Sequence, residues 1–195
     1  MTGLGEDFFA RDTARVARDL LGARLVRVVG NSVLEGKVVE TEAYYGEGDP
    51  PSHASSGRTA RSEIMWRKPG LAYVYLIYGM YFMFNVVTES RGSPGAVLIR
   101  AVEPLEGLDS MEKNRGGISG ADLTNGPGKL AQAFEIDRGL NGEDVVNSDQ
   151  ILFLARGNPN PNNIETSRRI GVSEGKEEEL RFYLAGNEYV SRRTD

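Results

Sequence analysis

Hydrophobic positions recur along the chain with two different periods, which predict a helix first and strands after it. In RDTARVARDLLG, residues 11–22, apolar side chains recur at i and i+4, as a helix with one buried face requires, and Gly22 ends it. ARLVRVV at 23–29 and LEGKVVETEAYY at 34–45 are rich in β-branched residues, and a Gly-Asn pair at 30–31 separates them. These stretches predict two strands joined by a tight turn.

A second pair of apolar stretches predicts a second hairpin. LAYVYLI at 71–77 and MYFMFNVV at 80–87 flank Tyr78 and Gly79. Gly79 can adopt the positive φ that such a tip often requires. Between the two hairpins, residues 46–63 are too polar and turn-rich for regular structure. A loop of this length in a compact domain is usually functional.

The rest of the chain adds more strands than helices. A strand is predicted at 95–104, a helix over 103–114 and a second helix within 123–136, with Asn125 as the N-cap of the second. Further strands are predicted at 150–155 (QILFLA), 167–172 (SRRIGV) and 180–186 (LRFYLAG). Several strands without βαβ alternation predict an α+β domain around a mainly antiparallel sheet, and 195 residues suit one domain.

Composition removes several kinds of chemistry. The chain has no cysteine and one histidine, so disulfides, thiolate chemistry and a zinc site of the usual kind are excluded. No clustered Asp motif predicts a magnesium site. No apolar run approaches the roughly 20 residues that span a bilayer, and the start, MTGLGEDFFARD, has no secretory pattern. We therefore expect a protein that is neither secreted nor in a membrane.

The distribution of charge leaves two interpretations open. A net charge of −5 speaks against a surface that is basic all round. Residues 58–68 nevertheless contain four basic side chains and one acidic one, and residues 11–27 contain five arginines and two aspartates. One basic face on an acidic body fits this pattern, and so do solvated charges without a function.

Two carboxylates on one predicted strand are the first candidates for chemistry. The period of a strand puts Val38, Glu40, Glu42 and Tyr44 on the same face. A carboxylate that faces inward beside an aromatic ring can act as a general base. The same pattern also fits two solvated strand charges, and the strand alone does not decide between them.

The second hairpin carries an unusual number of tyrosines. Tyr73 and Tyr75 share a face, and Tyr78 stands at the tip, where an exposed ring suits wedging between stacked bases. Tyrosines along a strand are also typical of ordinary sheet packing. His53, in PSHASSG, taken alone fits a loop histidine without a role.

Taken in order, these stretches resemble the alkyladenine DNA glycosylase family, the mammalian type of 3-methyladenine DNA glycosylase. The matching blocks run over nearly the whole chain: FFARDTARVARDLLG, VVETEAYYG with SHASSGRT, MWRKPGLAYVYLIYGMYFMFNV, AVLIRAVEPLEGL, LTNGPGKLAQAF and LRFYLAG. ETEAY together with YVYLIYGMYFMFN is highly specific. The fold implied is a single compact domain over residues 1–195, with a curved, mainly antiparallel sheet, flanking helices and a protruding hairpin.

The resemblance implies a monofunctional enzyme that excises alkylated or deaminated purines from duplex DNA, with no lyase step. Glu42 matches the general base that activates a water for attack on the sugar C1′. Arg100, in VLIRAVEP, matches the arginine that helps to hold this carboxylate and the water. The family uses no metal and no organic cofactor.

The resemblance also implies a pocket for a base that has been rotated out of the duplex. Tyr44, His53 and Tyr75 match the side chains that sandwich this base. Asn85 matches the asparagine at the pocket floor that obstructs the exocyclic amine of guanine, and Tyr78 matches the tyrosine that fills the gap in the DNA.

The partner implied is double-stranded DNA with damaged purines, bound by a monomer in the cytoplasm of a bacterium, at the nucleoid, or in the nucleus of a eukaryote. Two alternatives belong to other classes. A non-catalytic protein that binds damaged or single-stranded DNA would need neither Glu42 nor Arg100. A structural or protein-interaction domain would have Tyr75 and Tyr78 buried against its core.

Overall fold

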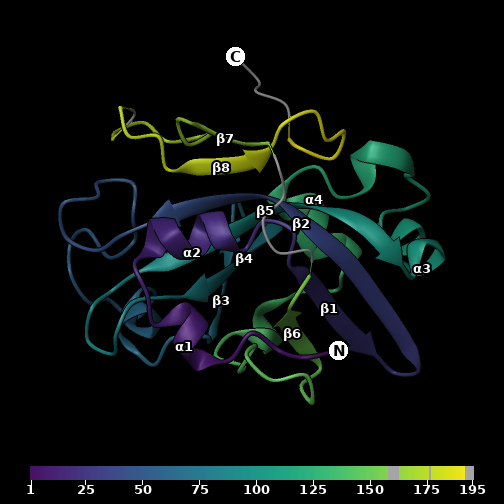
Figure 1. The fold of residues 1–195 in the computed structure, drawn as a ribbon, viewed down its shortest axis with the longest axis horizontal. Helices are drawn as coiled ribbons and strands as arrows, with labels where there is room; N and C mark the ends of the chain where they lie inside the picture. The colour runs from purple at the N-terminus through teal and green to yellow at the C-terminus, as the bar shows by residue number, and fades with distance from the viewer. Residues whose placement is uncertain (158–162, 176, 192–195) are drawn as a thin grey trace.

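The computed structural model describes residues 1–157, 163–175 and 177–191, and a long strand, β2, forms its centre (Figure 1). β2 spans Ser32–Tyr44, and its first half pairs with β1, Arg24–Val29. The two-residue turn between them contains Gly30 at φ 57°. The hairpin expected from the sequence is therefore confirmed.

Antiparallel pairing joins the strands of the described residues into one curled sheet. The main path has the order β3-β4-β5-β2-β1-β6, and β8 pairs with both β2 and β7. The remaining strands are β3 Ala72–Ile77, β4 Tyr81–Val87, β5 Ala96–Glu106, β6 Leu152–Ala155, β7 Ile164–Ser167 and β8 Arg181–Leu184. Because β2 changes partner from β1 to β8, its Glu40–Glu42 segment has β5 on one side and β8 on the other.

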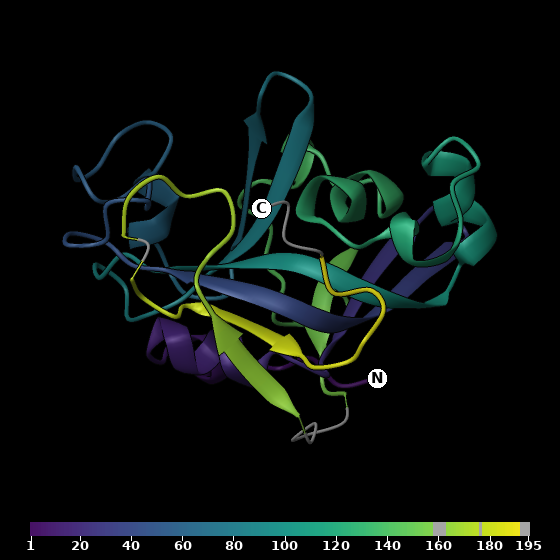
Figure 2. The same cartoon turned by 90° about the horizontal axis from the view of Figure 1, so that it is seen from above.

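Helices cover both faces of the sheet (Figure 2). They are α1 Glu6–Phe9, α2 Thr13–Asp19, α3 Leu108–Asn114 and α4 Pro127–Ala133, with 3-10 turns η1 Glu63–Trp66, η2 Gly120–Leu123 and η3 Arg138–Leu140. Asp12 caps α2 by accepting a hydrogen bond from the Arg15 amide, and Gly22 follows at φ 85°. Thr41 on β2 donates to the carbonyl of Ala17 at 2.8 Å. One face of β2 is therefore packed on α2, which leaves Glu40 and Glu42 to the other.

The β3–β4 hairpin stands out from the body of the protein (Figure 2). Ile77 pairs with Tyr81, so Tyr78, Gly79 and Met80 form its tip. Gly79 has φ 70° and Tyr78 has φ 53°. The prediction of positive φ at Gly79 is confirmed, and the fold class predicted from the sequence, α+β with an antiparallel sheet, is also confirmed.

Three local predictions are wrong. Of the strand expected at 167–172, only Ser167 belongs to a strand, β7. Asn125 does not cap α4: Gly126 occupies that position, and the Asn125 side chain accepts from Lys129 instead. Residues 103–106 continue β5, and α3 begins only after Gly107, at φ 80°. Within the described residues, no helix combines the length and apolar character needed to cross a bilayer.

Candidate active site

A cavity of about 310 Å³ opens between the hairpin, the loop after β2 and the segment before β8. Its volume lies at the lower end of the range for small-ligand pockets, about 300–1,000 Å³. The lining includes Tyr44, His53, Tyr73, Tyr75, Tyr78, Asn85, Arg100, Pro127, Ile170 and Val172. Six of the seven residues singled out from the sequence therefore border one space, although 56 positions separate the first from the last along the chain.

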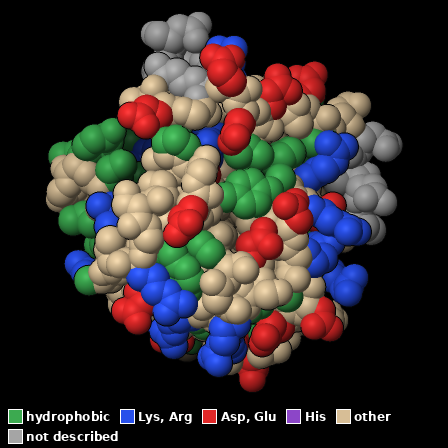
Figure 3. Space-filling view, turned by 90° about the vertical axis from the view of Figure 1, so that its left-hand side faces the viewer, with side chains coloured by type: hydrophobic (Ala, Val, Ile, Leu, Met, Phe, Trp, Pro, Cys, Tyr) green, Lys and Arg blue, Asp and Glu red, His purple; other side chains and the backbone are tan. Residues whose placement is uncertain are grey.

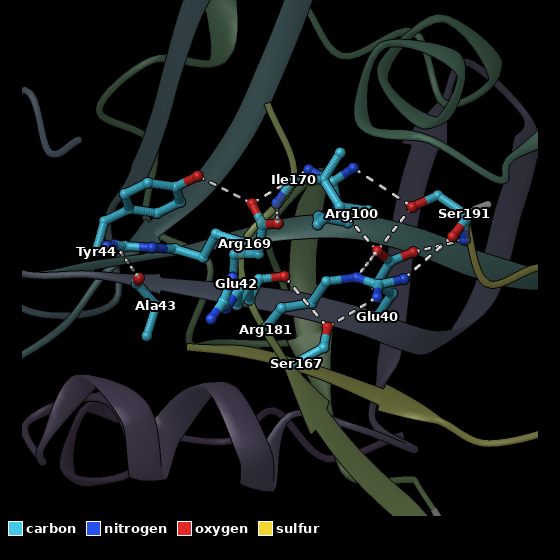
Figure 4. Close-up of polar contacts among 11 residues, drawn as sticks. Glu40, Glu42, Ala43, Tyr44, Arg100, Ser167, Arg169, Ile170, Arg181 and Ser191 are labelled. Atoms are coloured by element: carbon cyan, nitrogen blue, oxygen red, sulfur yellow. Dashed lines mark hydrogen bonds and ion pairs between the residues drawn. The ribbon is translucent and has the colours of Figure 1, made fainter. Parts of the chain in front are cut away.

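Glu42, the seventh, lies directly behind this lining and is fully buried. Its Oε2 accepts hydrogen bonds from Tyr44 Oη at 2.9 Å and from Arg100 Nη1 at 3.1 Å. Its Oε1 accepts from the backbone amide of Ile170 at 2.7 Å. Figure 4 shows the carboxylate between Tyr44 and Arg100. The interpretation of Glu42 as a solvated strand charge is therefore wrong.

Glu40 is also fully buried, on the same side of β2, and Arg100 joins the two carboxylates. Burial acts to lower the pKa of the Arg100 guanidinium, but the charges of Glu42 and Glu40 outweigh it and raise that pKa above its usual value. Arg100 is therefore a permanent cation at the wall of the cavity.

Tyr44 is both a wall of the cavity and a hydrogen-bond donor to Glu42. Burial raises the pKa of its phenol well above the usual value, and the negative charge of Glu42 raises it further. The phenol consequently keeps its proton and remains a donor. The Arg169 guanidinium lies over the Tyr44 ring at 4.8 Å, and Arg169 does not line the cavity.

Three aromatic side chains pack together on another wall. The His53 ring meets Tyr75 edge-on at 4.6 Å, and Tyr73 lies 5.1 Å from Tyr75. His53 Nδ1 and Tyr73 Oη are 2.8 Å apart. Burial, with a smaller contribution from Arg61, lowers the pKa of His53 to about 4, so the ring is neutral near pH 7. Burial raises the pKa of Tyr75 to about 12. This wall is therefore aromatic and uncharged.

The last two residues predicted for the site, Asn85 and Tyr78, differ in their exposure to solvent. Asn85 is buried on β4, and its Nδ2 donates to the Tyr73 carbonyl at 3.1 Å, which fixes the amide at the cavity wall. Tyr78 is 83% exposed at the tip of the hairpin. The alternative of a structural domain predicted that Tyr78 would be buried, and this prediction is wrong.

Comparison with known proteins agrees with this arrangement. A sequence model of the methylpurine-DNA glycosylase family matches residues 7–188. A relative from Carboxydothermus hydrogenoformans is 47% identical over 97% of this chain and 99% of its own. Relatives from Chlorobium phaeovibrioides and Desulfitobacterium hafniense are 46% and 44% identical, each over 98% of this chain, and cover 98% and 99% of their own. All three bear the name "Putative 3-methyladenine DNA glycosylase".

The chain belongs to the methylpurine-DNA glycosylase family. The resemblance seen in the sequence is thereby confirmed, and so is the enzyme class: a DNA glycosylase, which hydrolyses N-glycosyl bonds. Its substrate is DNA, as the family implies.

In this glycosylase, a buried ion pair behind the cavity wall, Arg169 with Asp49, was missed by the sequence analysis. Arg169, whose side chain is fully buried, holds Asp49 through two bonds of 2.9 and 2.7 Å and donates to the Ala43 carbonyl at 3.0 Å. The pair ties the segment that carries Ile170 to the loop that carries His53. Two adjacent arginines in an otherwise strand-like stretch, SRRIGV, were the only local signal.

The surface of the glycosylase carries both signs of charge. On the face in Figure 3, acidic side chains lie at the top, the centre and the lower edge, and basic side chains lie among them, mostly along the lower edge and the right. Some arginines already have partners, since Arg11 pairs with Asp19 at 2.8 Å and Arg58 lies 5.4 Å from the Trp66 ring. Among the described residues, no three His, Asp or Glu side chains are grouped so that they could hold a metal ion.

Proposed function

We propose that this glycosylase rotates an alkylated or deaminated purine out of duplex DNA into the cavity and hydrolyses its N-glycosyl bond with a water that Glu42 activates. The observation that carries the proposal is the position of Glu42, a buried carboxylate with three donors directly behind an aromatic cavity. Binding DNA alone requires no ionised carboxylate behind the cavity, and burying the charges of Glu42 and Arg100 costs free energy, so their position favours a role in the reaction.

The two carboxylate oxygens of Glu42 accept different numbers of hydrogen bonds from the protein. Each carboxylate oxygen can accept about two hydrogen bonds. Oε2 already accepts two, from Tyr44 and Arg100, whereas Oε1 accepts one, from Ile170. Oε1 therefore accepts fewer hydrogen bonds than Oε2, and we assign it the role of the oxygen that takes the proton.

In the proposed reaction, positive charge develops on the sugar as the purine leaves, and a proton then passes from the attacking water to Glu42. As the bond from C1′ to the base nitrogen breaks, its electron pair leaves with the base and positive charge develops on the sugar, as in other glycoside hydrolysis. The water oxygen forms the new bond to C1′, and its proton passes to Glu42. A cationic alkylated purine leaves as a neutral base and needs no acid, whereas neutral hypoxanthine leaves as an anion and takes a proton from water. The ionised Glu42 also stabilises the developing positive charge.

The aromatic wall accounts for holding the extruded base. Extrusion costs a few kcal/mol, least for a damaged or mispaired base, and stacking on aromatic rings returns roughly 1–3 kcal/mol per base. Tyr44, His53 and Tyr75 are the proposed stacking partners. Arg169 lies over one face of Tyr44 and Arg61 over one face of Tyr75, and the opposite tyrosine faces are the ones proposed to attract a cationic purine. Asn85 at the wall is the proposed obstacle to the guanine amine, and Tyr78 the proposed wedge that fills the gap in the duplex.

A base-release assay under single-turnover conditions tests the proposal, with duplexes that contain hypoxanthine or 1,N6-ethenoadenine and with undamaged duplex as reference. Replacing Glu42 removes the proton acceptor, so Glu42→Gln should slow release by about 100-fold or more, while lesion binding remains. Glu35→Gln is the matched control. It makes the same change on the same strand, at a carboxylate that pairs with Arg24 at 3.1 Å.

If folded Glu42→Gln released the purine at the wild-type rate, the assignment of Glu42 as the general base would be refuted. Tight binding of lesion DNA by the wild-type protein, without release from any duplex in the panel, would favour the non-catalytic binder instead.

A further inference from the structure

A second buried carboxylate lies next to the proposed base, and the proposed reaction does not use it. Glu40 is two residues before Glu42 on β2, is fully buried and does not line the cavity. Its Oε1 accepts three hydrogen bonds and its Oε2 one. Burying a carboxylate is costly unless it has partners, so a buried group with four bonds calls for an explanation.

One of the four donors is the arginine that also holds Glu42. Arg100 Nε donates to Glu40 Oε1 at 2.9 Å, while Arg100 Nη1 donates to Glu42 Oε2 at 3.1 Å. The guanidinium is planar and rigid, so a bond at Nε fixes the direction in which Nη1 points. Glu40 therefore determines the direction from which Arg100 Nη1 approaches Glu42, the proposed general base.

The other donors come from the C-terminal part of the chain. Arg181, at the start of β8, donates its Nε to Glu40 Oε1 at 2.7 Å. Ser191 donates its hydroxyl to Oε1 and its amide to Oε2, both at 2.7 Å. Arg181 is itself fixed, through Nη1 on the Ser167 hydroxyl and Nη2 on the Ser191 carbonyl. Figure 4 shows these groups around Glu40, on the side of Arg100 away from Tyr44.

Two carboxylates and two guanidiniums thus share one buried site, and their formal charges cancel. The balance matters for Glu42. If Glu40 were neutral, the full charge of Arg100 would act on Glu42 alone, and Arg181 would add a second unbalanced cation nearby. Both would stabilise the Glu42 anion before the reaction and weaken it as a proton acceptor.

We propose that Glu40, held by Arg181 and Ser191, is a positioning residue that aims Arg100 at Glu42 and shares its charge. Glu40 contacts neither the purine nor the attacking water, and it acts only through Arg100. The proposal rests on the proposed function of Glu42 as the base.

The test compares Glu40→Gln with wild-type protein and with the control Glu35→Gln. Rates of hypoxanthine release come from single turnover, and affinities come from binding of the same duplex. Misplaced reacting groups and lost outer partners each reduce rates substantially, so we expect release by Glu40→Gln to fall about 10- to 100-fold, with affinity within about 2-fold. Glu35→Gln should match wild type in both measurements.

A double variant separates positioning from folding. Glu40→Gln leaves Arg181 with an unbalanced buried charge, which lowers stability. Glu40→Gln combined with Arg181→Gln removes one charge of each sign, so the melting temperature should return towards the wild-type value. The release rate should stay low, because Arg100 still lacks its carboxylate at Nε. A purely structural role for Glu40 predicts that rate and melting temperature recover together.

Ser191→Ala is a milder probe that keeps all four charges. It removes the hydroxyl that contacts Glu40 at 2.7 Å and Arg100 Nη2 at 3.3 Å, and leaves the amide in place. We expect a smaller loss of rate than in Glu40→Gln, again with unchanged affinity.

The outcomes distinguish the positioning role of Glu40 from the role of Glu42 as general base, on which it rests. If wild-type protein releases the base and folded Glu40→Gln releases it equally fast, the positioning role is wrong and the role of Glu42 stands. Affinity that falls as much as the rate, or a double variant that regains the full rate, also overturns the positioning role. If wild-type protein releases no base while Glu42→Gln binds the lesion equally well, the proposed function fails, and Glu40 loses its role with it.

Discussion

The tip of the β3–β4 hairpin and the charged cluster around Glu42 lie at opposite extremes of solvent exposure. Tyr78 is 83% exposed and Met80 is 66% exposed, whereas Glu40 and Glu42 are both at 0%. The tip places apolar surface in water and Tyr78 at φ 53°, a conformation that few non-glycine residues adopt. The cluster removes four charges from water and satisfies them with one another.

The difference in exposure predicts that substitutions at the tip affect DNA binding without affecting stability, and that substitutions in the cluster affect both stability and catalysis. Side chains at the exposed tip contribute little to the folded state of the free protein, so their effect is expected on binding. In the cluster, each charge compensates for the burial of another, so removing one affects folding and chemistry together. Three variants test this difference, and the largest effect is expected in the cluster.

Arg100→Met should produce the largest loss of stability. It leaves two buried carboxylates with Arg181 as the only guanidinium among the described ion pairs of the cluster, and breaking such a pair typically costs about 3–5 kcal/mol. Urea denaturation at pH 7 measures the change in the free energy of unfolding. Arg15→Met is the control, because the Arg15 side chain is 68% exposed and a change there should stay within about 0.5 kcal/mol. Equal effects of the two substitutions would contradict the contrast.

Tyr78→Ala should have the opposite profile. Loss of a stacking ring typically costs roughly 1–3 kcal/mol, which weakens binding of a lesion duplex by about 5- to 150-fold. The free energy of unfolding should change by no more than about 0.5 kcal/mol, because the ring is exposed. Fluorescence anisotropy measures the affinity, and Tyr78→Phe, which keeps the ring, should bind like wild type. Collapse of thermal stability in Tyr78→Ala would mean that the ring belongs to the core.

The sequence carried enough local information to place residues in both regions. The alternation in KVVETEAYY correctly placed Glu40 and Glu42 on the same face, and Gly79 correctly marked the hairpin tip. Both depend on neighbours within a few residues, where strand period and turn geometry act directly. The family resemblance then supplied residue roles that no local pattern contains.

The partners of the buried carboxylates, in contrast, depend on contacts between distant residues. Arg181 and Ser191 reach Glu40 across 141 and 151 positions, and a strand that begins with an arginine gives no sign of its partner. The strand predicted at SRRIGV is wrong for the same kind of reason. The Ile170 amide, which a strand would use in a ladder, donates to Glu42, and Arg169 binds Asp49. Tertiary contacts at the site therefore override the local preference for a strand.

The smallest effect is expected at His53, which lines the same cavity as Tyr78 and Arg100 and contacts Tyr75 on β3. Burial and Arg61 lower its pKa from 6.5 to about 4. The unfolded chain therefore binds a proton at a higher pH than the folded one does, so stability should decline as the pH falls from about 6.5 towards 4. His53→Gln should show a weaker decline over this interval. His53 is the only histidine in the chain, so its imidazole NMR signals need no assignment, and they should titrate near pH 4. A midpoint near pH 6.5 would mean that the aromatic wall is open to water, so that its solvent exposure resembles that of the tip more than that of the buried cluster.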